Sequence, residues 1–398
     1  MTLEIIQIVQ ELSSVGGVES VALELAGVFG RAGVVNSVIA SNVASTVDRK
    51  TVIERVAPWL AKIPTRGALR HIGRALVVPL FTFVATRAAE RHKGAVVISH
   101  GDSLRGDVLV VHAVNAESLA EKRRSGSWRW LLNPTHLWVA ARDRWMIGGL
   151  RYRIFVAVSS RVAEELQRHY DVPRSRIRII PNGIDLDRFR PDPEAGARIR
   201  REFGIPADAR LLLFIGHEFD RKGLVHAVGA LELLDQDTWL LVVGSENPAP
   251  FRRMATKAGD RLVFAGSRRD VESFYAAADA FVFPTSYETF SLVCMEAMAT
   301  KVPVFATPVG GIEDYLQDGV NGFRIAPDAS DIAAKIRTVF ADPDLLARLR
   351  SGARATAERF GWDNIGSRYI ALAEELSKPE KSPEAEPTTL VHTGQEPA

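Results

Sequence analysis

The sequence has almost no cysteine and no long apolar run. Cys294 is the only cysteine among 398 residues, so no internal disulfide can form, which is typical of a reducing compartment. The longest apolar stretch, residues 75–85, contains Pro79 and Thr82 and is shorter than the about 20 residues that a membrane-spanning helix needs. No secretory signal precedes the first strand-like run. We therefore expect a cytoplasmic protein in which Cys294 packs in the core and is not a nucleophile.

The sequence also lacks an excess of charge of either sign. Its formal net charge is +2, so whole-chain electrostatics do not indicate nucleic-acid binding. Apolar residues make up 46% and charged residues 25%, as in ordinary globular proteins. No internal repeat is visible, and the length accommodates two domains of about 150–200 residues each.

Short apolar runs alternate with helical patterns in both halves of the chain. This alternation predicts an α/β fold with parallel sheets covered by helices on both faces. Because the pattern occurs in each half, we expect two Rossmann-like domains that face each other across a cleft. The predicted strands are 5–9, 95–99, 108–112 and 154–158 in the first half and 211–215, 239–243, 262–265, 280–283 and 303–306 in the second, and the first helix is 18–31.

The domain junction is predicted near residue 181, where a turn at 181–185 precedes a segment rich in proline and arginine. We assign residues 1–180 and 181–360 to the two domains. Residues 361–377 follow as a C-terminal helix. The remainder, 378–398, is rich in Pro, Glu, Thr and Lys and is expected to be disordered.

The most informative stretch is 284–322. Pro284 ends an apolar strand-like run, Glu288 lies in the following loop, and Glu296 lies eight residues later in a predicted helix that Ser291 could cap. The two carboxylates frame a helix N-terminus, whose amides and dipole favour an anion. A ligand that carries both phosphate and hydroxyl groups would use both features. The pattern therefore indicates a sugar nucleotide.

This series resembles the retaining family 4 glycosyltransferases of GT-B fold. Two glutamates at this spacing mean little alone, but the ordered series of motifs is specific, and the resemblance covers nearly the whole chain to about residue 377. The matching motifs are Glu288, Glu296 to Ala299, Pro303-Val304, Gly310-Gly311-Ile312, Asp318-Gly319 and Asn321-Gly322.

The resemblance implies a transferase that moves a sugar from a nucleoside diphosphate donor to a hydroxyl acceptor with retained anomeric configuration, without metal or cofactor. UDP-glucose is the leading donor candidate, and the acceptor would belong to glycan, lipopolysaccharide or glycolipid biosynthesis. The first domain would bind the acceptor, the second the donor, and the helix 361–377 would return to the first domain. Two alternatives stay open: a sugar-nucleotide epimerase of the same fold and a non-catalytic sugar-nucleotide-binding protein.

The resemblance also assigns roles in the second domain. Glu288 would contact the donor sugar and Glu296 the ribose hydroxyls. Backbone groups would hold the rest of the donor: the amides of Thr289, Phe290, Ser291 and Leu292 for phosphate and sugar, and the loop of Ser267 and Arg268 for the nucleobase.

Arg221 and Lys222 lie together in a loop that follows a predicted strand, and two adjacent cations suit a diphosphate. A solvated pair of side chains is the alternative. The adjacent Arg-Lys-Gly form resembles the branch of lipopolysaccharide-core glucosyltransferases. His217 stands where many family members have a phosphate-binding arginine, so one expected contact is missing.

Two features of the first domain point to the same ligand. Gly16 and Gly17, between the first strand and its helix, let a backbone approach phosphate, although a plain tight turn explains them equally. The dinucleotide pattern G-x-G-x-x-G is absent. His112 ends a predicted strand, on the side where open parallel sheets bind ligands, and family members often carry a histidine there. His100 is the rival candidate for that position.

No metal site is indicated. The two Asp-x-Asp matches, Asp185/Asp187 and Asp235/Asp237, lie in a linker and in a turn, and both are typical of turn chemistry.

Residues 121–153 combine tryptophan with basic residues and contain only two acidic ones. Such a composition on a surface helix favours peripheral contact with an anionic membrane, and hence a lipid-linked acceptor. A helix packed by its tryptophan face, with arginines in water, is the alternative. The tryptophans are Trp128, Trp130, Trp138 and Trp145, and the basic residues are Lys122, Arg123, Arg124, Arg129, Arg142, Arg144, Arg151 and Arg153.

Overall fold

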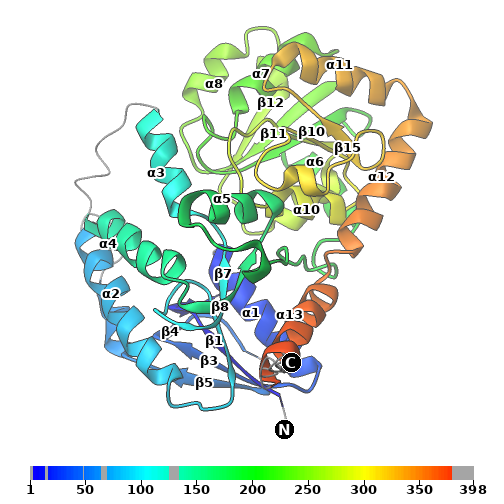
Figure 1. The fold of residues 1–398 in the computed structure, drawn as a ribbon. Helices are drawn as coiled ribbons and strands as arrows, with labels where there is room; N and C mark the ends of the chain where they lie inside the picture. Colours follow the sequence, from blue (N-terminus) through cyan, green and yellow to red (C-terminus); the bar gives the residue numbers. More distant parts are fainter. Residues whose placement is uncertain (1–2, 14–16, 48, 64–69, 125–133, 379–398) are drawn as a thin grey trace, which may run out of the picture.

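A computed structural model of the chain describes residues 3–13, 17–47, 49–63, 70–124 and 134–378, and these form two parallel sheets, each flanked by helices (Figure 1). The first sheet has seven strands in the order β5-β3-β1-β6-β7-β8-β9. Their bounds are β1 Glu4–Ile8, β3 Val35–Ala40, β5 Thr51–Arg55, β6 Val96–Ser99, β7 Gly106–Val111, β8 Tyr152–Ala157 and β9 Ile177–Ile179. The short β2 (Glu11–Leu12) and β4 (Asn42–Val43) pair beside it.

The second sheet has six strands in the order β12-β11-β10-β13-β14-β15. The central strand β10 is buried along almost its whole length, as expected for a parallel strand covered on both faces. The bounds are β10 Arg210–Ile215, β11 Thr238–Val243, β12 Leu262–Gly266, β13 Ala280–Phe283, β14 Val304–Ala306 and β15 Gly322–Arg324.

Helices cover both sheets, and several begin at a side-chain cap. Ser159 accepts a hydrogen bond from the Val162 amide at the start of its helix, and Asp192 and Asp342 cap two helices of the second half in the same way. The helices of the first half are α1 Gly17–Arg31, α2 Arg70–Ala89, α3 Asn115–Arg124, α4 Pro134–Asp143 and α5 Ser160–Tyr170. Those of the second half are α6 Pro193–Glu202, α7 Leu224–Leu233, α8 Ala249–Met254, α9 Val271–Ala277, α10 Leu292–Ala299, α11 Ala329–Phe340, α12 Pro343–Glu358 and α13 Trp362–Ser377.

The C-terminal helix α13 packs on the first sheet's side of the molecule, beside α1 (Figure 1). The approach is so close that a Cβ on Gly366 would lie 2.3 Å from a methyl carbon of Val28. An ion pair of 2.9 Å between Arg31 and Asp363 joins the same two helices. After forming the second sheet, the chain therefore returns to the first half and packs α13 against α1.

The strand ends of the two sheets meet directly. Ser159 and Ser160 follow β8, whereas Gly311 and Asp314 follow β14. A Cβ on Gly311 would lie 2.5 Å from the Ser159 Cβ, and the Ser160 amide donates to Asp314 Oδ2 at 2.8 Å. The carboxyl ends of both sheets, where parallel sheets bind ligands, therefore face one another.

The predicted α/β architecture with two Rossmann-like sheets is confirmed. The predicted strands of both halves are present to within one or two residues at most ends. The described part of 121–153 comprises the end of α3, the helix α4, a π-helical turn at 144–148 and the start of β8. Trp128 and Trp130 lie outside the described residues, as does the segment 379–398. No helix within the described ranges is both long and apolar enough to cross a bilayer.

Candidate functional site

An ion pair between Lys222 and Glu288 lies where β10 and β13 end. The Lys222 ammonium contacts Glu288 Oε1, and the two side chains are only 14% and 12% exposed. The ammonium also lies 5.0 Å from the centre of the Phe283 ring, which provides a cation–π contact. Thr285 Oγ1 lies 3.3 Å from the same carboxylate oxygen. A charge pair with so little access to water needs its partner, or a charged ligand in its place.

Two glycines allow this pair to form. Gly223, directly after Lys222, has φ +75°, and a Cβ there would lie 2.0 Å from the Pro284 carbonyl oxygen. Gly310 has φ +59°, and its Cβ would lie 1.6 Å from the Glu288 carbonyl oxygen. In both cases the obstructing atom belongs to the backbone and cannot swing away. Glycine at position 310, in the turn after β14, therefore allows the backbone of the loop that carries Glu288 to pack directly against this turn.

The N-terminus of α10 lies just beyond Glu288 and has no side-chain cap. Ser291 occupies the N-cap position with φ +66°, but its hydroxyl donates to Cys294 Sγ at 3.2 Å instead of accepting from the helix amides. The expectation that Ser291 caps this helix is therefore wrong, because its left-handed backbone turns the hydroxyl inward. Phe290 is buried beside it, and its carbonyl accepts from the Tyr315 hydroxyl at 3.0 Å. An uncapped α10 terminus can bind an anion.

Cys294 lies fully inside the core. Burial raises the pKa of its thiol to about 12, so the thiol carries no charge near neutral pH. The predicted packing role of Cys294 is confirmed.

Glu296 lies one turn further along α10 and accepts a hydrogen bond of 2.7 Å from the Tyr275 hydroxyl. Burial raises the pKa of Glu296, and the Tyr275 hydrogen bond and the Arg188 charge oppose this shift. Arg188 is itself held by Glu272 at 2.9 Å. Tyr275 and Arg188 were not predicted from the sequence, because nothing in it links a residue of α9 or the domain linker to a carboxylate on α10.

Arg221 points to the loop that carries Glu288. Its guanidinium pairs with Glu218 at 2.6 Å and donates to the Tyr287 carbonyl at 2.7 Å. The Ser286 amide returns a hydrogen bond of 3.0 Å to the Arg221 carbonyl. Arg221 therefore stabilises the loop that carries Glu288, and its positive charge can also interact with an anionic ligand. His217, in the position of the family arginine, contacts Ser245 Oγ at 3.1 Å.

The loop of Ser267 and Arg268 follows β12. The Arg268 guanidinium pairs with Asp270 at 2.9 Å and with Glu202 at 2.5 Å and lies over the Phe274 ring. The Arg268 side chain is thus engaged within the protein, whereas the backbone of this loop and the exposed Ser267 remain available to a ligand. Such backbone contact is the role that the sequence analysis gives to the loop.

In the first half, Gly17 begins α1 and Gly16 lies outside the described residues. A Cβ on Gly17 would meet no atom within 4 Å, so packing within the protein does not require glycine at this position. The exposed helix start that it forms is open to a ligand.

His112 directly follows β7, and His100 directly follows the neighbouring β6. The rings stack with centres 5.7 Å apart, and His100 Nδ1 lies 3.4 Å from His112 Nε2. Gln7 donates from its amide nitrogen to the Ala22 carbonyl, so its oxygen faces His100 Nε2, at 3.0 Å. Neutral His100 therefore carries its proton on Nε2 and accepts at Nδ1, which places the His112 proton on Nε2. His100 is the buried partner of the two, and His112 has the greater exposure.

The histidine pair predicts a pH-dependent stability. Burial lowers the pKa of His112 to about 4, against about 6.5 in an unfolded chain. Between these values the unfolded chain binds the extra proton, so stability falls as pH drops through this window. Between pH 7.5 and 5.0 this loss from His112 amounts to about 2 kcal/mol.

We therefore expect urea unfolding of the His112→Gln variant to lose about 2 kcal/mol less than the wild type between pH 7.5 and 5.0. His226→Gln, which replaces a partly exposed histidine of α7, is the control. Equal losses in wild type and His112→Gln would show that His112 is already charged in the folded state.

The residues of both Asp-x-Asp matches lie in turns. Asp185 Oδ1 accepts from the amides of Asp187 and Arg188, and Asp235 and Asp237 lie in the turn before β11. Within the described residues no group of His, Cys, Asp or Glu is arranged to hold a metal ion.

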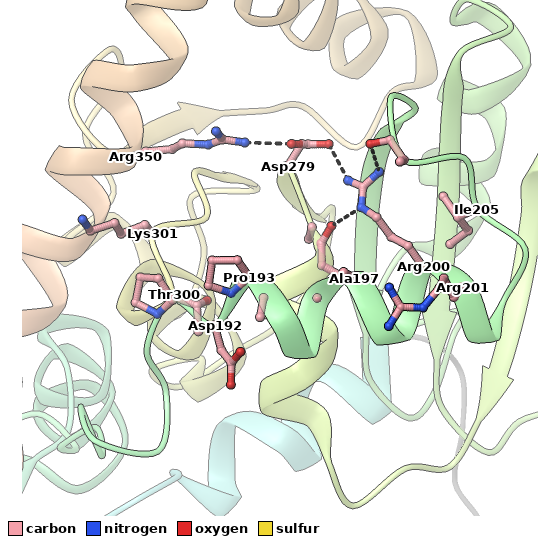
Figure 2. Close-up of a pocket in the computed structure, with 16 residues that line it drawn as sticks. Asp192, Pro193, Ala197, Arg200, Arg201, Ile205, Asp279, Thr300, Lys301 and Arg350 are labelled. Atoms are coloured by element: carbon pink, nitrogen blue, oxygen red, sulfur yellow. Dashed lines mark hydrogen bonds and ion pairs between the residues drawn. The ribbon is translucent and has the colours of Figure 1, made fainter.

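A separate pocket lies at the opposite end of the second sheet, between α6 and α12 (Figure 2). Asp279, which precedes β13, lies between Arg200 at 2.9 Å and Arg350 at 2.7 Å. Arg200 also donates to the Ala277 carbonyl at 3.1 Å and to carbonyls of the 206–209 turn. These charges satisfy one another, so the cluster is structural and distinct from the Lys222–Glu288 site.

The Lys222–Glu288 pair, the uncapped N-terminus of α10 and the partly buried Glu296 thus lie at one edge of the second sheet, and His112 lies at the facing edge of the first. No contact between described residues joins His112 to Glu288. The arrangement offers a cation and helix amides to phosphate, and carboxylates to hydroxyl groups.

Comparisons with known proteins agree with this arrangement. Residues 15–188 match the sequence family described as "Glycosyltransferase Family 4", and residues 197–356 match "Glycosyl transferases group 1". A curated relative from Xylanimonas cellulosilytica, named D-inositol 3-phosphate glycosyltransferase, is 35% identical over 56% of this chain and 57% of its own length. A relative of the same name from Streptomyces bingchenggensis is 36% identical over 53% of this chain and 50% of its own length. The matches thus span little more than half the length of these relatives.

Similar solved structures share the fold. WaaG, a glycosyltransferase involved in lipopolysaccharide biosynthesis, has a TM-score of 0.73 and 22% identity over 93% of this chain and 99% of its own. Anabaena Alr3699/HepE in complex with UDP and glucose has a TM-score of 0.69 and 19% identity, over 95% of this chain and 100% of its own.

Proposed function

We propose that this chain, a member of the GT-B superfamily of glycosyltransferases, moves a sugar from a nucleoside diphosphate sugar to an acceptor hydroxyl and retains the anomeric configuration. The observation that carries the proposal is the enclosed Lys222–Glu288 pair beside the uncapped N-terminus of α10. Diphosphate in this position would attract the ammonium and accept hydrogen bonds from the helix amides.

The remaining residues fit the rest of such a donor. Glu296, which accepts a hydrogen bond from the Tyr275 hydroxyl, would accept from ribose hydroxyls as well. Glu288 would accept from hydroxyls of the sugar once Lys222 turns to the diphosphate. The start of α1 at Gly17 would contact the diphosphate from the facing domain, and His112 would contact the transferred sugar with its unprotonated Nδ1.

In the transfer, the bond between the anomeric carbon and the diphosphate oxygen breaks while the acceptor oxygen bonds to the same face of that carbon. The acceptor proton passes to an oxygen of the leaving diphosphate, which keeps the proton count balanced. Lys222 and the α10 amides stabilise the charge that develops on the diphosphate, so the protein positions reactants and stabilises charge. We infer that these groups suffice without a metal ion or cofactor.

We propose a UDP-sugar as donor, with UDP-glucose as the first candidate, because a protein of similar fold binds UDP and glucose. For the acceptor, the names of the relatives favour inositol phosphate, and the name of the WaaG structure favours a lipopolysaccharide or related glycan. A lipid-linked acceptor would also agree with membrane contact through 121–153. In the described part of that segment, Trp138 packs against Phe83 of α2 and Trp145 is 44% exposed.

Thermal unfolding with a panel of UDP-, GDP-, ADP- and dTDP-sugars tests the donor. A donor at a hundred times its dissociation constant should add about 2.7 kcal/mol to the free energy of unfolding, which gives a clear rise in Tm. We expect one nucleotide class to respond and the rise to persist in EDTA. A rise that EDTA removes would overturn the metal-free proposal, and no rise with any donor at millimolar concentration would overturn donor binding.

Turnover separates the two alternatives. An epimerase would convert the stabilising donor into its isomer with no acceptor present. A non-catalytic binding protein would show the rise in Tm but no release of nucleoside diphosphate with any acceptor, whereas the proposed transferase releases it only when an acceptor hydroxyl is supplied.

A further inference from the structure

The outer face of α2 is apolar. Leu76, Leu80, Phe83 and Val84 are 52%, 41%, 50% and 36% exposed. Their spacing of four, three and one residues places them on one side of the helix. A solvent-facing stripe of this kind is unusual, because the outer face of a surface helix is normally polar.

The inner face of α2 is apolar as well. Val77, Phe81 and Ala85 are at most 1% exposed and belong to a core cluster with strands of the first sheet. Packing within the chain therefore accounts for the inner face only. Contiguous exposed apolar groups of this kind mark a surface that contacts another molecule.

The helix α4 and the turn after it extend the stripe, since α2 and α4 lie side by side (Figure 1). Phe83 of α2 contacts Trp138 of α4, with ring centres 5.8 Å apart. Leu137 and Trp145 are 49% and 44% exposed. We call the exposed apolar residues Leu76, Leu80, Phe83, Val84, Leu137 and Trp145 the α2–α4 patch.

A basic pocket of about 600 Å³ opens at one end of the α2–α4 patch. Its apolar lining comes from Phe83, Leu104 and Trp145, so the pocket and the patch are continuous. Four arginines and one glutamate supply its charged lining: Arg87, Arg91, Arg105, Arg151 and Glu90.

The arginines are only partly neutralised. Arg105 pairs with Glu90, and Arg91 lies 3.9 Å from Glu54. Arg87 and Arg151 have no acidic partner in the described part of the chain, and the Arg151 guanidinium lies 4.6 Å from the centre of the Trp145 ring. The pocket therefore keeps an excess of positive charge next to exposed apolar side chains.

We propose that the α2–α4 patch docks on an anionic phospholipid bilayer. Its leucines, Phe83 and Trp145 enter the interface between head groups and acyl chains, and the arginines of the pocket bind lipid phosphates. Trp145 and the arginines suit this interface, because each has an apolar body and a polar tip. The surface differs from the 121–153 segment of the sequence analysis, because most of it comes from α2.

Charge favours a bilayer over a second copy of the chain. In a symmetric dimer the same patch would face itself, which would bring two sets of unneutralised arginines together. Like charges opposed in this way disfavour association, whereas an anionic lipid surface attracts them. The proposal concerns docking only and does not depend on the proposed sugar transfer.

Sedimentation of the full chain with vesicles tests the proposal. We expect binding to phosphatidylcholine vesicles that contain phosphatidylglycerol to be at least tenfold tighter than to phosphatidylcholine alone, and to weaken in high salt. The double variants Arg87→Gln/Arg151→Gln and Leu80→Ser/Phe83→Ser should each weaken it at least tenfold. Leu233→Ser, an exposed apolar residue of the second half, is the matched control and should bind as the wild type does.

Tryptophan fluorescence gives a second readout, because Trp145→Phe should remove part of the vesicle-induced blue shift if Trp145 enters the interface. Circular dichroism of each variant checks that it is folded. Binding that is equal for both vesicle types, or unchanged in both double variants, would overturn the proposal. Absence of vesicle binding combined with a dimer that Leu80→Ser/Phe83→Ser dissociates would assign the patch to a second copy instead.

Discussion

Replacing Lys222 with methionine should lower kcat for sugar transfer by about 10²–10³-fold, the loss typical of one preorganised group that stabilises a developing oxyanion. Methionine keeps an unbranched apolar stem over the Phe283 ring and removes only the ammonium. Because Lys222 is 14% exposed and lies beside the proposed diphosphate position, water cannot fully replace its charge. The loss should appear in kcat, since the leaving diphosphate gains charge in the transition state.

The measurement is steady-state release of nucleoside diphosphate with the donor identified by thermal unfolding. Lys257→Met, an exposed lysine of the same half, is the matched control and should retain full activity. Lys222→Arg tests the geometry, because it keeps the charge but changes its reach, and an intermediate loss is expected. A fall of less than threefold for Lys222→Met would contradict the role of Lys222 in the transfer.

Removal of Lys222 also leaves Glu288 without its cation. The carboxylate is 12% exposed, so its unpaired charge should lower the stability of the variant. The double variant Lys222→Met/Glu288→Gln separates the two effects. If its activity falls below that of Glu288→Gln alone, the ammonium acts on the diphosphate and not only on Glu288.

Most of the predicted strands were recognisable because they are buried on both faces and consist largely of apolar residues. β11 and β13 are examples, since nearly all of their residues are buried. By contrast, β5 at the sheet edge contains Glu54 and Arg55 and leaves Val52 60% exposed, so its sequence lacks that signal. The strand pattern therefore identified most inner strands and the edge strand β12, but it missed the edge strands β5, β9 and β15 and the inner strand β3.

The proposed site was predictable only in part. The sequence motifs indicated Glu288, Glu296 and Lys222, but not the contact between Lys222 and Glu288, which are 66 residues apart. That contact depends on how two strand ends are placed by the sheet, and no local pattern encodes it. The same holds for Tyr275 and Glu296. Ser291 was misread because residue type suggests a cap, whereas its backbone angle of φ +66° decides where the hydroxyl points.

Gly310→Ala should be the most damaging single-methyl change at the proposed site. Gly310 combines φ +59° with a Cβ position 1.6 Å from the Glu288 carbonyl oxygen, so an alanine requires the Glu288 loop itself to move. A left-handed conformation alone costs an alanine about 1–2 kcal/mol. The backbone clash adds to this, and we expect a total loss above about 4 kcal/mol in the free energy of unfolding, which marks a core steric conflict.

Gly319→Ala separates the two contributions. Gly319 also has a left-handed backbone, with φ +74°, but its Cβ would meet no atom within 4 Å. Urea unfolding should therefore show a loss of only about 1–2 kcal/mol for Gly319→Ala. The donor-induced rise in Tm should survive in Gly319→Ala and vanish in Gly310→Ala, because only the latter displaces Glu288 from Lys222. Equal losses of stability in the two variants would mean that the backbone angle, and not the contact with the Glu288 loop, requires glycine at 310.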